Sequence, residues 1–129
     1  MVSSWRQIQR KNFTSLELLA DFLHWDARCK EAVLQKSNFP LNFPWRLAAK
    51  VTKNCLDDPI LKQFLPSLEE LVPDPSFSLA PVQDALFQKG SSKKLLHKYQ
   101  GRALLLVSGA CAMHCRYCFR RNYEYERVY

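Results

Sequence analysis

The feature that most constrains the fold of this chain is an apolar run that leads directly into three closely spaced cysteines. Residues 102–108 (RALLLVS) have the length of a strand. Cys111, Cys115 and Cys118 follow at once. A continuous apolar run of this length is typical of a strand buried on both faces, as in a parallel sheet with helices outside. Ligand sites in such architectures lie beyond the carboxyl ends of the strands. The sequence therefore predicts an α/β fold with a cysteine-containing loop after a buried strand.

The spacing of the cysteines, C-x3-C-x2-C, favours an iron–sulfur cluster over a zinc site. Three thiolates can hold a [4Fe–4S] cluster and leave one iron open to another ligand. A structural zinc ion needs a fourth Cys or His, commonly from a second pair. His114 lies inside the loop and Cys55 lies far upstream, so neither gives a standard zinc pattern. A non-catalytic iron–sulfur or zinc-binding module is the alternative interpretation of the same cysteines.

Composition bounds the class of protein and its compartment. The 129 residues suffice for one ordinary domain, and the 47% of hydrophobic residues can form a core. The odd count of five cysteines, three of them clustered, indicates metal ligation in a reducing compartment rather than disulfides. No apolar run approaches the ~20 residues that span a bilayer. The N-terminus lacks the apolar stretch of a secretory signal, so we expect a soluble, cytoplasmic protein without a membrane partner.

The charge of the chain raises a second alternative, nucleic-acid binding. The 19 Lys and Arg residues against 12 Asp and Glu residues give a net charge of +7, and residues 116–129 form a basic, aromatic tail. A basic balance is also typical of proteins that bind anionic small molecules, and of a chain that lacks an acidic half. We therefore expect no nucleic-acid partner, and salt-dependent binding to RNA or DNA would contradict this.

Residues 1–100 are predicted to be a mainly helical N-terminal region, and residues 101–129 to begin a second domain. Thr14 and Glu17 have the spacing of a capping box at the start of a helix. The apolar face of that helix carries Leu16, Leu19, Phe22 and Leu23. Asp58 followed by proline predicts another helix start. The further predicted helical segments are 27–35, 45–53, 59–65, 68–72 and 81–87.

The residues around the cysteines resemble the radical S-adenosylmethionine (SAM) superfamily. Within it, residues 101–121 (GRALLLVSGACAMHCRYCFRR) resemble the lysine 2,3-aminomutase family. Upstream segments that resemble the family are 43–46 (FPWR), 57–66 (DDPILKQFLP) and 96–99 (LHKY). The resemblance covers roughly residues 39–125 and is greatest to the branch that supplies β-lysine for the modification of elongation factor P. Tyr117 favours this branch, because the clostridial type has histidine at that position.

This resemblance implies a fold, a reaction and three cofactors. The fold would be a radical SAM partial (β/α) barrel, of which the chain supplies the first strand and the cluster loop after its helical N-terminal region. The enzyme would be an isomerase that converts α-lysine to β-lysine with a [4Fe–4S] cluster, SAM and pyridoxal 5′-phosphate (PLP). SAM would supply the radical and PLP would carry the migrating amino group. Glutamate and arginine relatives share the cysteine loop, so the choice of amino acid stays open.

The resemblance also assigns roles to the cysteines and to four residues that would contact the cofactors. Cys111, Cys115 and Cys118 would ligate the cluster. Tyr117 would contact the adenine of SAM, although a packing role is the alternative. Lys98, Tyr99 and Arg102 correspond to positions that contact the PLP phosphate. The alternative is that these basic residues merely flank a strand.

Arg120 corresponds to the family arginine that grips the substrate carboxylate. A guanidinium group matches a carboxylate with two parallel hydrogen bonds. The alternative is a solvated surface arginine. The lysine that binds PLP and the acidic residues that hold the substrate ε-ammonium group are not assignable up to Tyr129. We therefore expect the chain to be an N-terminal fragment that is inactive alone.

Overall fold

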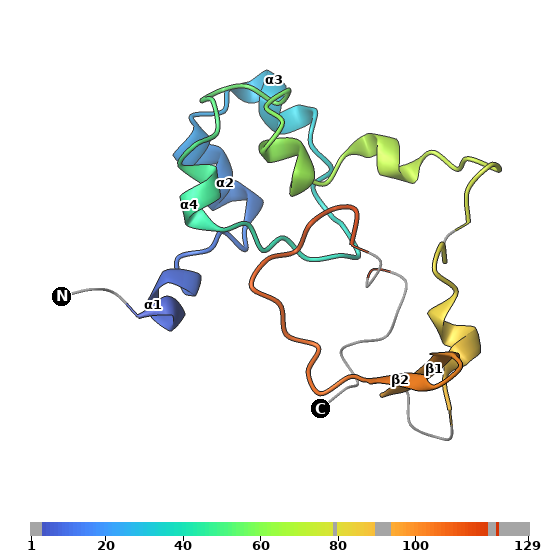
Figure 1. Cartoon of the computed structure of the whole chain (residues 1–129). Coiled ribbons are helices and arrows are strands. Elements are labelled where there is room, and N and C mark those ends of the chain that lie inside the picture. The colour runs from blue at the N-terminus through green and yellow to red at the C-terminus, as the bar shows by residue number, and fades with distance from the viewer. Residues whose placement is uncertain (1–3, 79, 90–93, 119–120, 122–129) are drawn as a thin grey trace. The chain divides into compact units, whose positions relative to one another are not determined.

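The computed structural model describes residues 4–78, 80–89, 94–118 and 121 (Figure 1). It has two compact units. The helical unit consists of residues 4–73 together with Ala112–Tyr117. The hairpin unit consists of the described residues of 74–111 and 118–121. The cysteine loop is therefore shared between the units, and its central residues belong to the helical one.

Short helices make up most of the regular structure. The α-helices are α1 (Trp5–Gln9), α2 (Leu16–Leu23), α3 (Ala27–Glu31) and α4 (Trp45–Ala48). The 3₁₀ helices are η1 (Leu61–Gln63), η2 (Leu68–Leu71) and η3 (Asp84–Phe87). The strands are β1 (Leu95–Tyr99) and β2 (Arg102–Leu105). Each predicted helical segment contains a helix, but those after α2 are shorter than predicted, because helices of one or two turns depend on tertiary packing for their stability.

Side-chain caps begin α1, α2, α3 and η2, and in α2 the cap lies one residue later than predicted. Ser15 is the N-cap of α2, and its Oγ accepts a hydrogen bond from the Leu18 amide at 3.4 Å. The predicted capping box of Thr14 and Glu17 is therefore wrong by one residue. Ser15 has the extended backbone that an N-cap requires, and its hydroxyl also hydrogen-bonds the Glu17 carboxylate.

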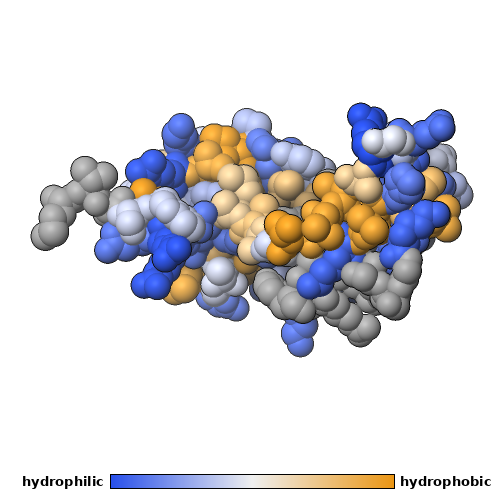
Figure 2. Space-filling model, turned by 60° about the horizontal axis from the view of Figure 1, so that its bottom comes forward, coloured by the Kyte–Doolittle hydropathy of each residue, from blue (hydrophilic) through white to orange (hydrophobic). Residues whose placement is uncertain are grey.

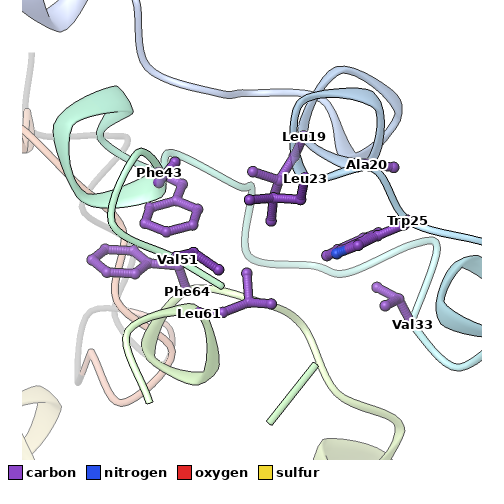
Figure 3. Close-up of a cluster of buried hydrophobic side chains, with 10 residues drawn as sticks. Leu19, Ala20, Leu23, Trp25, Val33, Phe43, Val51, Leu61 and Phe64 are labelled. Carbon is purple, nitrogen blue, oxygen red and sulfur yellow. The ribbon is translucent and has the colours of Figure 1, made fainter. Parts of the chain in front are cut away.

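The core of the helical unit forms around α2 (Figure 3). Its buried residues are Leu19, Ala20, Leu23, Trp25, Val33, Phe43, Ala48, Val51, Leu61 and Phe64. Phe43 stacks on Phe64 with the ring centroids 4.5 Å apart. The backbone of Phe43 also exchanges two hydrogen bonds with Phe13, at 2.8 and 2.9 Å. The predicted apolar face of α2 is confirmed, because Leu19 and Leu23 are completely buried.

The hairpin unit contains an antiparallel pair of strands where the sequence predicted a buried parallel strand. β1 and β2 pair with Leu95 opposite Leu105 and Tyr99 opposite Arg102. Gly101 forms the turn with a φ of +77°, a conformation that glycine adopts without steric cost. All four residues of β2 are exposed.

For the described residues, a strand in this region is confirmed, but its predicted burial and parallel pairing are wrong. β1 also lies within the segment that was predicted to be mainly helical. An apolar run does not reveal which strand it will pair with, since pairing depends on residues elsewhere in the chain. The barrel, and a domain boundary near residue 101, stay predictions.

Apolar side chains reach the surface of both units (Figure 2). Those of the hairpin unit that are more than half exposed are Phe77, Leu86, Tyr99, Leu104, Leu105 and Val107. Among the described residues, no helix has the length and apolar character that crossing a bilayer requires.

Candidate functional site

The centre of the cysteine loop is attached to the helical unit by hydrogen bonds. Asn12 Nδ2 donates to the Ala112 carbonyl at 2.9 Å and to Asn42 Oδ1 at 2.8 Å. The amide of His114 donates to the Asn42 carbonyl at 3.0 Å. His114 Nδ1 lies 3.0 Å from the Pro40 carbonyl oxygen, which can only accept, so Nδ1 is the donor of this hydrogen bond. These contacts fix the path of the loop before its second cysteine.

A buried arginine, Arg116, makes further hydrogen bonds between the loop and the helical unit. Its Nε and one terminal nitrogen donate to the two carboxylate oxygens of Glu70 at 2.8 and 2.6 Å. The guanidinium also donates to the Phe39 carbonyl at 3.1 Å and to Ser37 Oγ at 2.9 Å. The backbone amide of Arg116 donates to the Gln63 carbonyl at 2.7 Å. Arg116 is only 8% exposed, so these interactions are shielded from water.

The three cysteines have different environments. Cys115 is half-buried and packs against the core of the helical unit. Cys111 is exposed and Cys118 is half-buried, and both belong to the hairpin unit. Within the described ranges, no group of three or more Cys, His, Asp or Glu side chains is arranged to hold a metal ion.

The donor atoms of the loop nevertheless fit an iron–sulfur cluster by type. Cysteine thiolates are the usual ligands of such clusters, and a loop with three of them could leave one iron open to another ligand. Where a metal site is not preformed, metal binding and local folding are coupled. The ligand set of Cys111, Cys115 and Cys118 stays a prediction.

Of the two other predicted binding residues near the cysteines, Tyr117 and Arg120, the structure describes only Tyr117. Tyr117 is 75% exposed, so its ring is accessible to a ligand. Arg120, the predicted carboxylate-binding residue, lies outside the described residues.

The structure places the three predicted phosphate-binding residues in one pocket of the hairpin unit. Lys98, Tyr99 and Arg102 line a pocket of about 430 Å³ together with Asp84. The rest of its lining is apolar: Val82, Leu96, Ala103 and Leu104. The hairpin turn produces this arrangement, because Tyr99 pairs directly with Arg102 across it.

The cationic side chains of this pocket, Lys98 and Arg102, contact other residues that line it. Lys98 Nζ lies 3.8 Å from Asp84 Oδ1 and also donates to the Val82 carbonyl. The Arg102 guanidinium lies over the Tyr99 ring, 4.4 Å from its centroid. Two cations and a phenol around an apolar cavity can bind a phosphorylated aromatic ring, since such pockets combine apolar walls with a few polar groups.

Sequence reasoning missed Asp84 and Glu70. Nothing in the sequence around Asp84 indicated a place in the pocket. Glu70 carries a local signal, because Ser67 and Glu70 have the spacing of a capping box, which the structure contains at η2. That signal predicts a helix start, but not the ion pair with Arg116.

No family model matches the chain. An L-lysine 2,3-aminomutase of Escherichia coli (strain K12) is 46% identical over 90 residues, which are 70% of this chain and 25% of that relative. The L-lysine 2,3-aminomutase of Haemophilus influenzae is 29% identical over 124 residues, or 95% of this chain and 36% of the relative. That of Clostridium subterminale is 30% identical over 125 residues, or 94% and 29%. The chain thus spans about a quarter to a third of the length of these curated relatives.

Proposed function

Because the chain is related to the lysine 2,3-aminomutases over part of their length, we propose that it supplies the cluster-binding part of such an enzyme. The complete enzyme would convert α-lysine to β-lysine in a radical SAM partial barrel. The observation that carries the proposal is the C-x3-C-x2-C loop in a chain that is 46% identical to an aminomutase over 90 residues. Alone, the chain would bind the cluster without turning over lysine.

In this proposal, Cys111, Cys115 and Cys118 hold the cluster as thiolates. The bound cluster and SAM supply one-electron chemistry, while the protein orients them and excludes competing reactions. Tyr117, whose ring is exposed, would pack on the adenine of SAM. Arg120 would hold the carboxylate of the substrate.

The pocket of the hairpin unit is proposed to bind the phosphate of PLP. Lys98 would exchange its 3.8 Å contact with Asp84 for a direct hydrogen bond to a phosphate oxygen. Arg102 would present a second cation, and the Tyr99 hydroxyl a neutral donor. Both cations already line the cavity, so little side-chain rearrangement is required.

The branch and the compartment are narrower proposals. A tyrosine at position 117, where the clostridial type has histidine, supports the branch that modifies elongation factor P. The clustered cysteine thiols support a cytoplasmic location, because thiols stay reduced there.

Anaerobic reconstitution tests the cluster. The chain is incubated with iron and sulfide, and its content of iron, sulfide and zinc is then quantified. EPR spectra are recorded before and after reduction with dithionite. About four irons and four sulfides per chain, with an EPR signal that SAM alters, would support the proposal. A Cys115→Ala variant should lose most of this iron, while Cys55→Ala should retain it. One zinc per chain, or colourless protein without an EPR signal, would instead support a zinc module or no metal site.

A further inference from the structure

Arg116 lies inside the cysteine motif, yet its side chain is directed into the helical unit. It is one of two buried polar or charged residues in the described part of the chain, the other being Asp58. Its side chain hydrogen-bonds to Ser37, Phe39 and Glu70, which belong to the same compact unit. A residue in this position is well placed to determine where the loop sits.

The ion pair between Arg116 and Glu70 is better suited to positioning than to stabilising the fold. The side chains are 7% and 18% exposed, so both charges lose hydration when the pair forms. For buried pairs, that desolvation can match the Coulombic gain, whereas removing one partner leaves an uncompensated charge. The bidentate geometry, with distances of 2.8 and 2.6 Å, permits little freedom of orientation.

The backbone of Arg116 transmits this constraint to Cys115. The amide of Arg116 belongs to the peptide bond that follows Cys115, and it donates to the Gln63 carbonyl at 2.7 Å. Cys115 itself packs against the core. Side chain and backbone together therefore fix the orientation of the peptide that carries the second cysteine.

We infer that Arg116 is a positioning residue, whose ion pair with Glu70 holds the cysteine loop on the helical unit and fixes where Cys115 presents its sulfur. The inference rests on the proposed function only in taking Cys115 to be a cluster ligand. Arg116 would touch neither cluster nor substrate and would act through the loop.

Thiol alkylation tests the positioning without any cluster. The metal-free chain is treated with iodoacetamide, and modification of each cysteine is followed by mass spectrometry. Arg116→Gln should raise the rate at Cys115 about tenfold, since a buried hydrogen bond to a charged group is worth more than a factor of ten in an equilibrium. Cys29, half-buried against the same core, reports whether the helical unit stays folded. Its rate should not change.

Three further variants separate positioning from a general effect of charge. Glu70→Gln keeps the shape of the acceptor but removes its charge, and should also accelerate alkylation of Cys115. Arg116→Lys keeps the cation but loses the bidentate contact, so its rate should fall between those of the native chain and Arg116→Gln. Arg10→Gln removes an exposed cation of the helical unit and should change nothing.

The outcomes at Cys115 and Cys29 decide the inference. Faster alkylation at Cys115 alone supports it. Unchanged rates at both cysteines overturn it, and so do equal increases at both, because Arg116 would then stabilise the whole unit rather than the loop. As a second readout, cluster assembly should be about tenfold slower in Arg116→Gln than in Arg10→Gln, in line with the same loss of loop order. Failure of the native chain to bind iron would refute the proposed function and leave the alkylation result to judge the positioning role.

Discussion

Asp58 illustrates how a single buried carboxylate organises a turn of the helical unit. Its Oδ1 accepts from the amides of Ile60 and Leu61 at 2.9 and 3.2 Å, and its Oδ2 accepts from the Thr52 amide at 3.0 Å. Asp58 therefore accepts hydrogen bonds at the start of this turn, as a capping residue would, but the helix η1 begins two residues later than predicted, with Ile60 as its N-cap. The hydrogen bond from Thr52 was not revealed by the sequence. Asp58→Asn should lower the free energy of unfolding by about 1–3 kcal/mol, because an amide offers one acceptor where the carboxylate offers two. Urea denaturation followed by the fluorescence of buried Trp25 measures this difference.

The contribution of Asp58 to the free energy of unfolding should depend on pH. The hydrogen bond from the Thr52 amide is the main reason that the pKa of Asp58 lies below its usual value of 3.8. A lowered pKa in the folded state adds stability that is present above the unfolded value and is lost as the pH falls through the folded value. The difference in unfolding free energy between the native chain and Asp58→Asn should therefore shrink below about pH 4. A difference that stays constant from pH 7 to pH 3 would contradict this assignment.

In the pocket of the hairpin unit, Lys98 and Asp84 are expected to make opposite contributions to the binding of a phosphate. Lys98→Gln should weaken binding of PLP about tenfold, because it removes a charge-assisted hydrogen bond to the phosphate. Asp84→Asn should strengthen binding, because the carboxylate that lies 3.8 Å from Lys98 repels a phosphate and competes for the cation. Equilibrium dialysis measures both effects, with unphosphorylated pyridoxal as the matched ligand. Equal changes for pyridoxal and PLP would show that the pocket does not recognise the phosphate.

At the scale of elements, the hairpin depends on Gly101. Its φ of +77° is unfavourable for residues with a Cβ, although a Cβ there would meet no described atom within 4 Å outside Gly101 and its two neighbours in the chain. Gly101→Ala should therefore destabilise the pairing of β1 with β2 through the backbone alone, by about 1–2 kcal/mol. Amide hydrogen exchange of the strands should be several-fold faster in this variant. Gly101→Asn is the matched control and should cost less, because asparagine tolerates a positive φ better.

Local signals account for what could be predicted about the elements. The caps at Asp58 and near Ser15 and the apolar face of α2 involve residues within one or two turns of each other, so their spacing in the sequence is informative. The partner of β2 is not a local property, and the apolar run 102–108 had the same appearance for a buried parallel strand as for an exposed hairpin strand.

In the candidate site, too, contacts between residues far apart in the chain could not be predicted from the sequence. Lys98, Tyr99 and Arg102 were predicted from the resemblance to the aminomutase family, and a two-residue turn brings them to one pocket. Their role in binding a phosphate stays a prediction. Glu70 is 46 residues from Arg116, and nothing in either segment reveals that they meet.

For the whole molecule, the distribution of buried side chains differs between the two units. The helical unit has a ten-residue core, whereas Leu96 is the buried hydrophobic residue of the described hairpin unit. The hairpin unit also carries exposed apolar residues on β2 (Figure 2). A two-stranded hairpin without further packing is marginally stable in water. Stability should therefore be concentrated in the helical unit.

Two leucine substitutions test this distribution. Leu19→Ala should lower the free energy of unfolding by about 2–5 kcal/mol, because Leu19 is fully buried and its loss leaves a cavity. Leu105→Ala removes the same atoms from a side chain that is 62% exposed, so it should change stability by less than about 0.5 kcal/mol. Urea denaturation monitored by far-UV circular dichroism measures both. Comparable losses in the two variants would mean that β2 is buried as the sequence first predicted, and that the apolar run 102–108 contributes to the core of the folded chain.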